Sequence, residues 1–177
     1  MSARVYANWK RGIVIDAFRH RGLSPEVAPL VTVAPGSRRR AVITCRRSID
    51  RLIVGYHQRR SHALIDIEEC PVLTPAIVSA LPGLRALTDL LLERSGELRA
   101  VVVLTEAGVD VSLECNRQLD AGLRAEIARI ATRHHFCRLS FAGEPVVELA
   151  RPELMFAGVA IAPPPGTFLQ AEASAEA

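Results

Sequence analysis

The sequence lacks the long apolar segments of a membrane protein and the leader pattern of an exported one. Hydrophobic residues make up 49% of its 177 residues and charged residues 23%, yet no apolar run approaches the roughly 18–20 residues that span a bilayer. Trp9-Lys10-Arg11 interrupts the N-terminal segment, so no basic-then-apolar signal is present. We therefore expect a cytoplasmic protein with no membrane partner, long enough for one globular domain or one and a half.

Paired cysteines are also missing. None of the four cysteines stands in a C-x-x-C pair, which argues against a zinc site built from local pairs. A disulfide framework is not expected in a cytosolic protein. We expect Cys45, Cys115 and Cys137 to be small buried apolar residues, as free cysteines commonly are. Cys70 stands apart, because it lies where a helix is about to begin.

The sequence contains no glycine-rich strand-to-helix turn of the kind that cradles a nucleotide cofactor. The stretch Pro163-Pro164-Pro165-Gly166 opens no βαβ unit, and only seven residues follow Gln170. A doubly wound domain needs roughly 100–150 residues more. We therefore expect a Rossmann-like catalytic domain to be absent from this sequence.

Lysine is nearly absent, and the basic charge is distributed unevenly. Of the 22 basic residues only Lys10 is a lysine. Residues 1–60 hold 13 basic and 3 acidic residues (+10), which leaves 9 basic and 16 acidic residues (−7) for the remainder. Arginine suits bidentate phosphate contacts, and a strongly basic half favours a polyanionic partner. Solvated surface arginines are the alternative interpretation.

The hydrophobic pattern predicts three helices and several short strands. Apolar residues recur at helical spacing over 4–21, over 74–94 with a break or kink at Pro82-Gly83, and over 120–134. Thr74 and Asp120 are the expected N-caps. Alternating and β-branched stretches predict strands, of which the first places Ala41, Ile43 and Cys45 on one face. The predicted strands are 40–47, 52–56, 63–67, 99–105, 109–115, 137–141, 145–149 and 154–161.

These elements predict an α+β fold of antiparallel strands covered by two or three helices. The first three strands are expected to form a meander, and the strands of 99–105 and 109–115 a hairpin across Glu106-Ala107-Gly108. The tail 171–177 is low in complexity and is expected to fray.

Three sequence blocks, taken in order, resemble a known enzyme family. They are Tyr6-Ala7-Asn8-Trp9-Lys10-Arg11, the stretch from Ser61 through Glu69-Cys70-Pro71 to Pro75, and Pro163 to Gln170. In this order they resemble the central segment of the bacterial SAM-dependent RNA (uracil-5-)-methyltransferases of the iron–sulfur type, over about residues 4–171. The resemblance implies that residues 1–162 are a central, RNA-substrate domain and that residues 163–177 lead into a SAM-binding methyltransferase domain. It also implies a fragment, truncated at both ends and unable to methylate alone.

The resemblance implies roles for three residues of the blocks. In the iron–sulfur members, a Cys-Pro at the place of Cys70 supplies the fourth ligand of a [4Fe–4S] cluster, whose other ligands would precede Met1. From the residues alone, the preferred interpretation of Cys70 is a capping cysteine at a helix start. The family's Phe-x-Gln element contacts SAM, and Phe168-Leu169-Gln170 matches it. We expect the chain by itself to bind neither cofactor, since one thiolate cannot hold a cluster that needs four.

Seven arginines are the expected contacts to structured RNA, either rRNA or tRNA, and no DNA partner is expected. They are Arg38, Arg39, Arg40, Arg46, Arg47, Arg59 and Arg60. Tyr56 and His57 are candidates for stacking on a base, although single aromatic residues usually pack. The histidines His134 and His135 are expected to end a helix. Two alternatives stay open beside the methyltransferase fragment: a stand-alone RNA-binding module, and a remnant without function.

Overall fold

The computed structural model describes residues 2–173, which divide into two compact units at the boundary between Ala34 and Pro35. The first unit contains helix α1 (Ala3–Arg19), as the pattern predicted, with Ser2 as its N-cap. None of the residues of α1 is buried within its unit. Arg11 Nε donates to the carbonyl oxygen of Val27 at 2.9 Å, which ties the helix to the strand-free segment that follows it.

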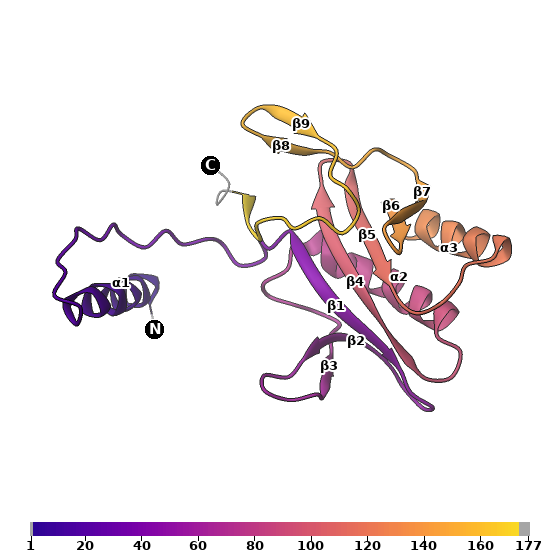
Figure 1. Ribbon diagram of the computed structural model, residues 1–177, viewed down its shortest axis with the longest axis horizontal. Coiled ribbons are helices and arrows are strands. Elements are labelled where there is room, and N and C mark those ends of the chain that lie inside the picture. Colours follow the sequence, from indigo (N-terminus) through magenta and orange to yellow (C-terminus); the bar gives the residue numbers. More distant parts are fainter. Residues whose placement is uncertain (1, 174–177) are drawn as a thin grey trace. The chain divides into compact units, whose positions relative to one another are not determined.

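The second unit is built on a seven-stranded sheet of order β3-β2-β1-β4-β5-β6-β7 (Figure 1). Strands β1, β2 and β3 form the predicted meander, and β4 and β5 the predicted hairpin. The strands are β1 (Arg40–Arg47), β2 (Leu52–His57), β3 (Leu64–Asp66), β4 (Gly96–Thr105), β5 (Gly108–Glu114), β6 (Phe136–Phe141) and β7 (Glu144–Glu148).

The sequence prediction was wrong on two strand relationships. β5 and β6 pair in parallel rather than antiparallel, because helix α3 (Ala121–Arg133) connects them and returns the chain to the same end of the sheet. The stretch 154–161 is a separate hairpin of two strands, β8 (Leu154–Phe156) and β9 (Val159–Ile161). The turn between them places Ala157 and Gly158 at positive φ, which a single strand does not allow.

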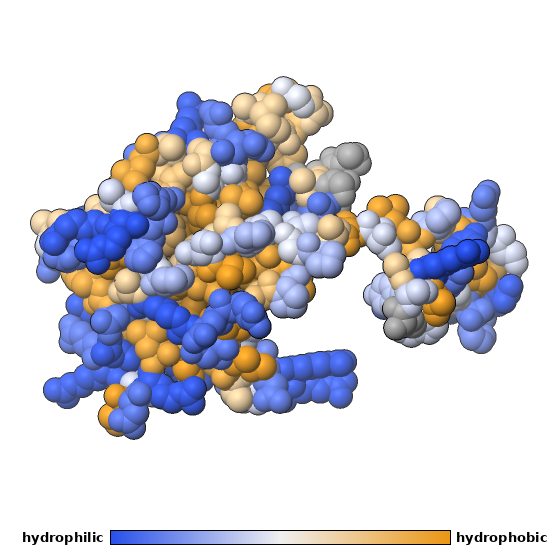
Figure 2. Space-filling view, turned by 180° about the vertical axis from the view of Figure 1, so that it is seen from behind, coloured by the Kyte–Doolittle hydropathy of each residue, from blue (hydrophilic) through white to orange (hydrophobic). Residues whose placement is uncertain are grey.

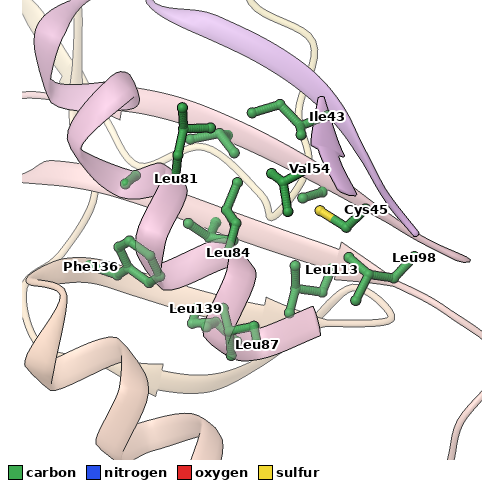
Figure 3. Packing of buried hydrophobic residues seen from close by; sticks show 14 of the residues in the cluster. Ile43, Cys45, Val54, Leu81, Leu84, Leu87, Leu98, Leu113, Phe136 and Leu139 are labelled. Carbon is green, nitrogen blue, oxygen red and sulfur yellow. The ribbon is translucent and has the colours of Figure 1, made fainter. Parts of the chain in front are cut away.

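Two helices, α2 (Pro75–Leu91) and α3, cover one face of the sheet and enclose the core. Leucines of α2 meet apolar side chains from the strands (Figure 3). Ala41, Ile43 and Cys45 of β1 point into this core, as their alternation predicted. Cys137 is buried as well, whereas Cys115 is only half-buried. No helix within residues 2–173 is both long and apolar enough to cross a bilayer.

Helix α2 does not break at Pro82-Gly83, where an interruption was one of the two predicted outcomes; it is continuous from Pro75 to Leu91. Thr74 occupies the predicted N-cap position, but its side chain makes no capping hydrogen bond. Asp120 does cap α3, and accepts a hydrogen bond from the Leu123 amide at 2.8 Å. His134 ends α3, and His135 follows at positive φ, as expected for a helix terminus.

Asp66 links three elements of the second unit. Its Oδ1 accepts hydrogen bonds from the Val54 amide and from Arg85 of α2, both at 2.8 Å. Burial on its own raises the pKa of Asp66, but these hydrogen bonds and the charge of Arg85 outweigh it and hold the pKa below its usual range. The carboxylate therefore stabilises the fold in its ionised form.

Replacing Asp66 by asparagine is expected to lower the free energy of unfolding by about 1–2 kcal/mol at neutral pH, because the charge-assisted hydrogen bonds are weakened. Because the folded-state pKa is lowered, this contribution is fully present above the unfolded value of about 3.9 and disappears as the pH falls through the folded value. Urea unfolding at several pH values measures the difference between the two chains. The exposed Asp50→Asn is the control, and a difference that grows in acid would contradict the assignment.

Candidate functional site

Residues 163–171 lie on the face of the sheet opposite the helices. Val101 and Val103 alternate with Ala100 and Val102 along β4, so that the two pairs face opposite sides. Ala100 and Val102 join the core under α2, whereas Val101 and Val103 pack with Leu154 and Leu169 in a second cluster. Figure 1 shows this C-terminal segment passing back toward the start of β1.

The segment is fixed at its beginning by a buried ion pair whose two residues were not among the predicted site residues. Arg138 of β6 and Asp110 of β5 are 5% and 3% exposed. Arg138 Nε and Nη2 donate to the two carboxylate oxygens of Asp110 at 3.0 and 2.8 Å, and Nη2 also donates to the Pro163 carbonyl at 2.9 Å. Burial lowers the pKa of Arg138, but the hydrogen bonds and charge of Asp110 outweigh it and raise the pKa above its usual value.

Arg40, predicted to contact RNA, holds the middle of the same segment. Its Nε donates to the Thr167 carbonyl at 3.4 Å, and its guanidinium lies 5.3 Å from the ring centre of Phe168. Burial, and then the positive charges of Arg99 and Arg38, lower the pKa of Arg40. Beside it, the Arg39 amide donates to the Ala171 carbonyl at 2.8 Å. Phe168 and Gln170 are exposed and Leu169 between them is buried, so the two predicted cofactor-side residues project from the surface.

A cavity of about 360 Å³ brings residues from two further predictions together beside this segment. Arg38, Arg40, Tyr56 and Cys70 are among its lining residues. Tyr56 is half-buried against the core, and burial raises the pKa of its hydroxyl. Two of the arginines predicted to contact RNA, the cysteine predicted as a cluster ligand and the phenylalanine predicted to face SAM therefore lie around Arg40, although they are far apart in the sequence.

Arg46 and Arg47 at the end of β1 are engaged in ion pairs. Arg46 donates to Glu97 Oε2 from Nη2 at 2.7 Å and from Nε at 3.0 Å, and Arg47 pairs with Asp89 of α2. Each of these guanidinium groups would have to leave a carboxylate before it could neutralise a phosphate. These two arginines are thus less suited to RNA contact than their place in the sequence predicted.

Arg59 and Arg60 lie in the turn between β2 and β3 and are exposed. Within residues 2–173 neither side chain makes an ion pair or a side-chain hydrogen bond, unlike Arg46 and Arg47. His57 and His62 flank them and are exposed as well. Figure 2 shows mostly hydrophilic surface, broken by hydrophobic patches, over the lower part of the second unit, which contains this hairpin. Of the seven predicted arginines, these two present their charge to solvent most directly.

Cys70 is half-buried between the cavity that Arg40 and Tyr56 line and the start of α2. Within the described residues, no group of three or more His, Cys, Asp or Glu side chains is placed to hold a metal ion. Cys45 and Cys137 are buried in the fold, and neither they nor Cys115 is among the residues that line the two cavities beside Cys70. The described residues therefore do not by themselves fit a [4Fe–4S] cluster.

The cysteines are expected to differ in their reaction with iodoacetamide at pH 8. Burial raises the pKa of Cys45 to about 11, and its side chain is fully buried, so its alkylation should be more than about tenfold slower than that of Cys70. Peptide mass spectrometry over time measures both rates. In denaturant all four cysteines should react alike, and equal rates in the folded chain would contradict the burial of Cys45.

The comparisons with known proteins relate this chain to RNA methyltransferases. It is 39% identical over 175 residues to an uncharacterized RNA methyltransferase of Rhizobium meliloti, covering 99% of this chain and 42% of that protein. It is 40% identical over 171 residues to an uncharacterized RNA methyltransferase of Brucella suis, covering 97% and 41%. The chain is homologous to part of these RNA methyltransferases. It therefore spans about two fifths of the length of these curated relatives.

Two further matches name a base. Over 118 residues the chain is 35% identical to the 23S rRNA (uracil(1939)-C(5))-methyltransferase of Hahella chejuensis, covering 64% of this chain and 26% of that protein. The fold resembles that of the Pyrococcus abyssi tRNA (uracil-54, C5)-methyltransferase, solved with S-adenosyl-L-homocysteine. That likeness has a TM-score of 0.65 at 15% identity and covers 96% of this chain and 45% of the other. No protein-family model matches the chain.

Proposed function

We propose that this chain is the RNA-substrate part of a SAM-dependent RNA (uracil-5-)-methyltransferase of the iron–sulfur type. The observation that carries the proposal is the alignment of nearly the whole chain with only part of two RNA methyltransferases, at 39–40% identity. The named uracil-C5 enzymes among the matches support the choice of base. Methyl transfer requires a SAM-binding domain, which the proposal assigns to a sequence outside this chain, in cis or in trans.

In this proposal none of the four cysteines is the nucleophile that attacks uracil. An attacking thiol must reach the base and ionise near neutral pH. Cys45 is fully buried with its pKa raised to about 11, and burial also raises the pKa of Cys115 and of Cys137. Cys70 keeps its proposed role as one ligand of a cluster, whose other ligands would come from outside the described residues.

Phe168 and Gln170 are proposed to face SAM at the junction between the two parts of the enzyme. Both are exposed on a segment whose backbone is fixed to the sheet. A glutamine amide both donates and accepts hydrogen bonds, which suits the amino and carboxylate groups of SAM. The division at residue 163 into a substrate domain and a junction segment follows the same proposal.

Arg59 and Arg60 are proposed as the leading RNA contacts, with Arg38 beside the cavity as a third. Their support is exposure without a competing carboxylate, in contrast to Arg46 and Arg47. Arg39 and Arg40 contribute to the same basic surface but also adjoin residues 167–171. Guanidinium groups that are not ion-paired neutralise RNA phosphates without first breaking an interaction within the protein.

The double variant Arg59→Ala, Arg60→Ala is expected to weaken binding of a tRNA transcript and of an rRNA hairpin several-fold at low salt. The slope of log affinity against log salt should fall by about 0.7 for each phosphate that the variant no longer neutralises. Fluorescence anisotropy at a series of salt concentrations measures both quantities. Arg124→Ala, Arg133→Ala removes the same charge from α3, at the opposite edge of the sheet. Equal effects of the two double variants would overturn the assignment to the β2–β3 turn.

The enzymatic part of the proposal is tested with a chimera. This chain replaces the aligned part of the Rhizobium meliloti relative, and transfer of labelled methyl from SAM to RNA uridine is measured. Formation of 5-methyluridine above the level of the relative's remaining part alone is the expected result. If the chimera binds RNA but transfers no methyl group, a binding module is favoured instead. If it shows neither RNA binding nor methyl transfer, a remnant without function is favoured.

A further inference from the structure

The segment 163–171 is held in place without belonging to either sheet. Within it lie turns and irregular backbone, with no strand residue. Its anchors are three carbonyl groups spaced four residues apart: Pro163 bound by Arg138, Thr167 by Arg40, and Ala171 by the Arg39 amide. Irregular segments without such anchors are ordinarily the most mobile parts of a fold.

The segment also makes close steric contact with the sheet. Leu169 is 5% exposed in the cluster with Val101 and Val103. At Gly166, which has a φ of +70°, an added Cβ would lie 3.3 Å from Ser112 Oγ. The anchored carbonyls and these contacts fix the backbone on both sides of Phe168 and Gln170, whose own side chains face outward.

Arg138 makes a hydrogen bond to the Pro163 carbonyl that its ion pair with Asp110 does not require. A buried pair is often replaceable by apolar residues without loss of stability, so stability alone does not account for it. Arg138 satisfies Asp110 through two nitrogens and directs Nη2 at the Pro163 carbonyl as well. A guanidinium forms this fixed fork, whereas a lysine ammonium cannot reproduce its directions.

We propose that Arg138 and Arg40 are positioning residues that clamp residues 163–171 on the sheet and so fix the direction in which Phe168 and Gln170 leave its surface. That the fixed element serves a SAM pocket rests on the function proposed above; the clamp itself does not. Neither arginine is proposed to touch the methyl group. They act through the segment that they hold.

Hydrogen exchange of the 177-residue chain tests the clamp. Arg138→Lys keeps the charge opposite Asp110, and Arg40→Gln removes the interactions with Thr167 and Phe168. In each variant two amides are expected to exchange more than about tenfold faster, with the core strands unchanged: that of Thr167, which donates to the Pro164 carbonyl, and that of Arg39, which donates to the Ala171 carbonyl. Arg117→Lys is the matched control, because Arg117 also bonds a carbonyl and a carboxylate, those of Leu91 and Glu93, elsewhere in the unit. Unchanged exchange at the Thr167 and Arg39 amides, or an equal rise throughout the sheet, would overturn the clamp.

The same substitutions in the chimera test whether the clamp positions residues that bind SAM. The KM for SAM is expected to rise by about fivefold or more in Arg138→Lys, with a smaller change in kcat, because the binding element is no longer held in its preset position. The thermal midpoint of each variant is measured in parallel. An unchanged KM for SAM in an active chimera would overturn the positioning role. An unmodified chimera that does not methylate would count against the proposed function, while the exchange experiment still decides the clamp.

Discussion

Asp110→Ala is expected to lower the free energy of unfolding by about 3–5 kcal/mol, because it leaves the guanidinium of Arg138 buried without its counter-charge. Arg138 is 5% exposed, and two of its three side-chain hydrogen bonds go to Asp110. The remaining bond to the Pro163 carbonyl does not neutralise a charge. Urea unfolding followed by far-ultraviolet circular dichroism measures the loss of stability.

The neighbouring pair of Arg99 and Glu114 provides the matched control. It also joins an arginine and a carboxylate on adjacent strands, at 2.8 Å, but both side chains are about half exposed. Glu114→Ala should therefore cost less than about 1 kcal/mol. If Asp110→Ala costs no more than Glu114→Ala, the burial of the Arg138 pair is wrong.

The double variant Asp110→Val, Arg138→Met covers the case in which Asp110→Ala does not fold. Removing both charges together eliminates the unpaired buried ion, and most of the stability should return. In the same variant the Pro163 carbonyl has no guanidinium donor. The double variant is thus expected to recover stability but not the anchoring of residues 163–171. This result would distinguish the effect of the ion pair on stability from its effect on the position of the segment.

The sequence was sufficient where one local pattern decides the structure. The alternation of Ala41, Ile43 and Cys45 with Val42, Thr44 and Arg46 predicted which face of β1 joins the main core. Asp120 before an amphipathic stretch predicted the start of α3. These features depend on periodicity and capping, which are properties of consecutive residues.

The sequence was insufficient where distant residues meet. Arg138 and Asp110 each stand between apolar residues inside a predicted strand. This alternation is the one signal in the sequence that each side chain leaves the apolar face of its strand. That they are adjacent follows only from the parallel pairing of β5 and β6, which the prediction of antiparallel strands excluded. In the same way, the carboxylates of Glu97 and Asp89 that engage Arg46 and Arg47 lie more than 40 residues away. A run of arginines in a sequence therefore does not tell free charges from paired ones.

Gly83→Ala is expected to destabilise the second unit by about 1–3 kcal/mol, although alanine is the better helix former by about 1 kcal/mol. A Cβ at this position would lie 2.5 Å from Phe136 Cζ and 2.9 Å from His134 Cβ. Phe136 is 1% exposed and is among the largest fully buried side chains of the core. Its ring can give way only by displacing other packed residues or separating α2 from the α3–β6 connection.

The same substitution at Gly12 in α1 isolates the steric cause, because nothing lies within 4 Å of a Cβ there. Gly12→Ala should leave the cooperative unfolding of the second unit unchanged and favour helix α1. Thermal melts followed by circular dichroism should show a midpoint lower by roughly 2–8 °C for Gly83→Ala alone, since about 1 kcal/mol corresponds to a few degrees in a domain of this size. A midpoint that rises in Gly83→Ala would mean that α2 does not approach Phe136 as closely as the structure places it. Close approach at Gly83 would then no longer account for how α2 packs against α3 and β6.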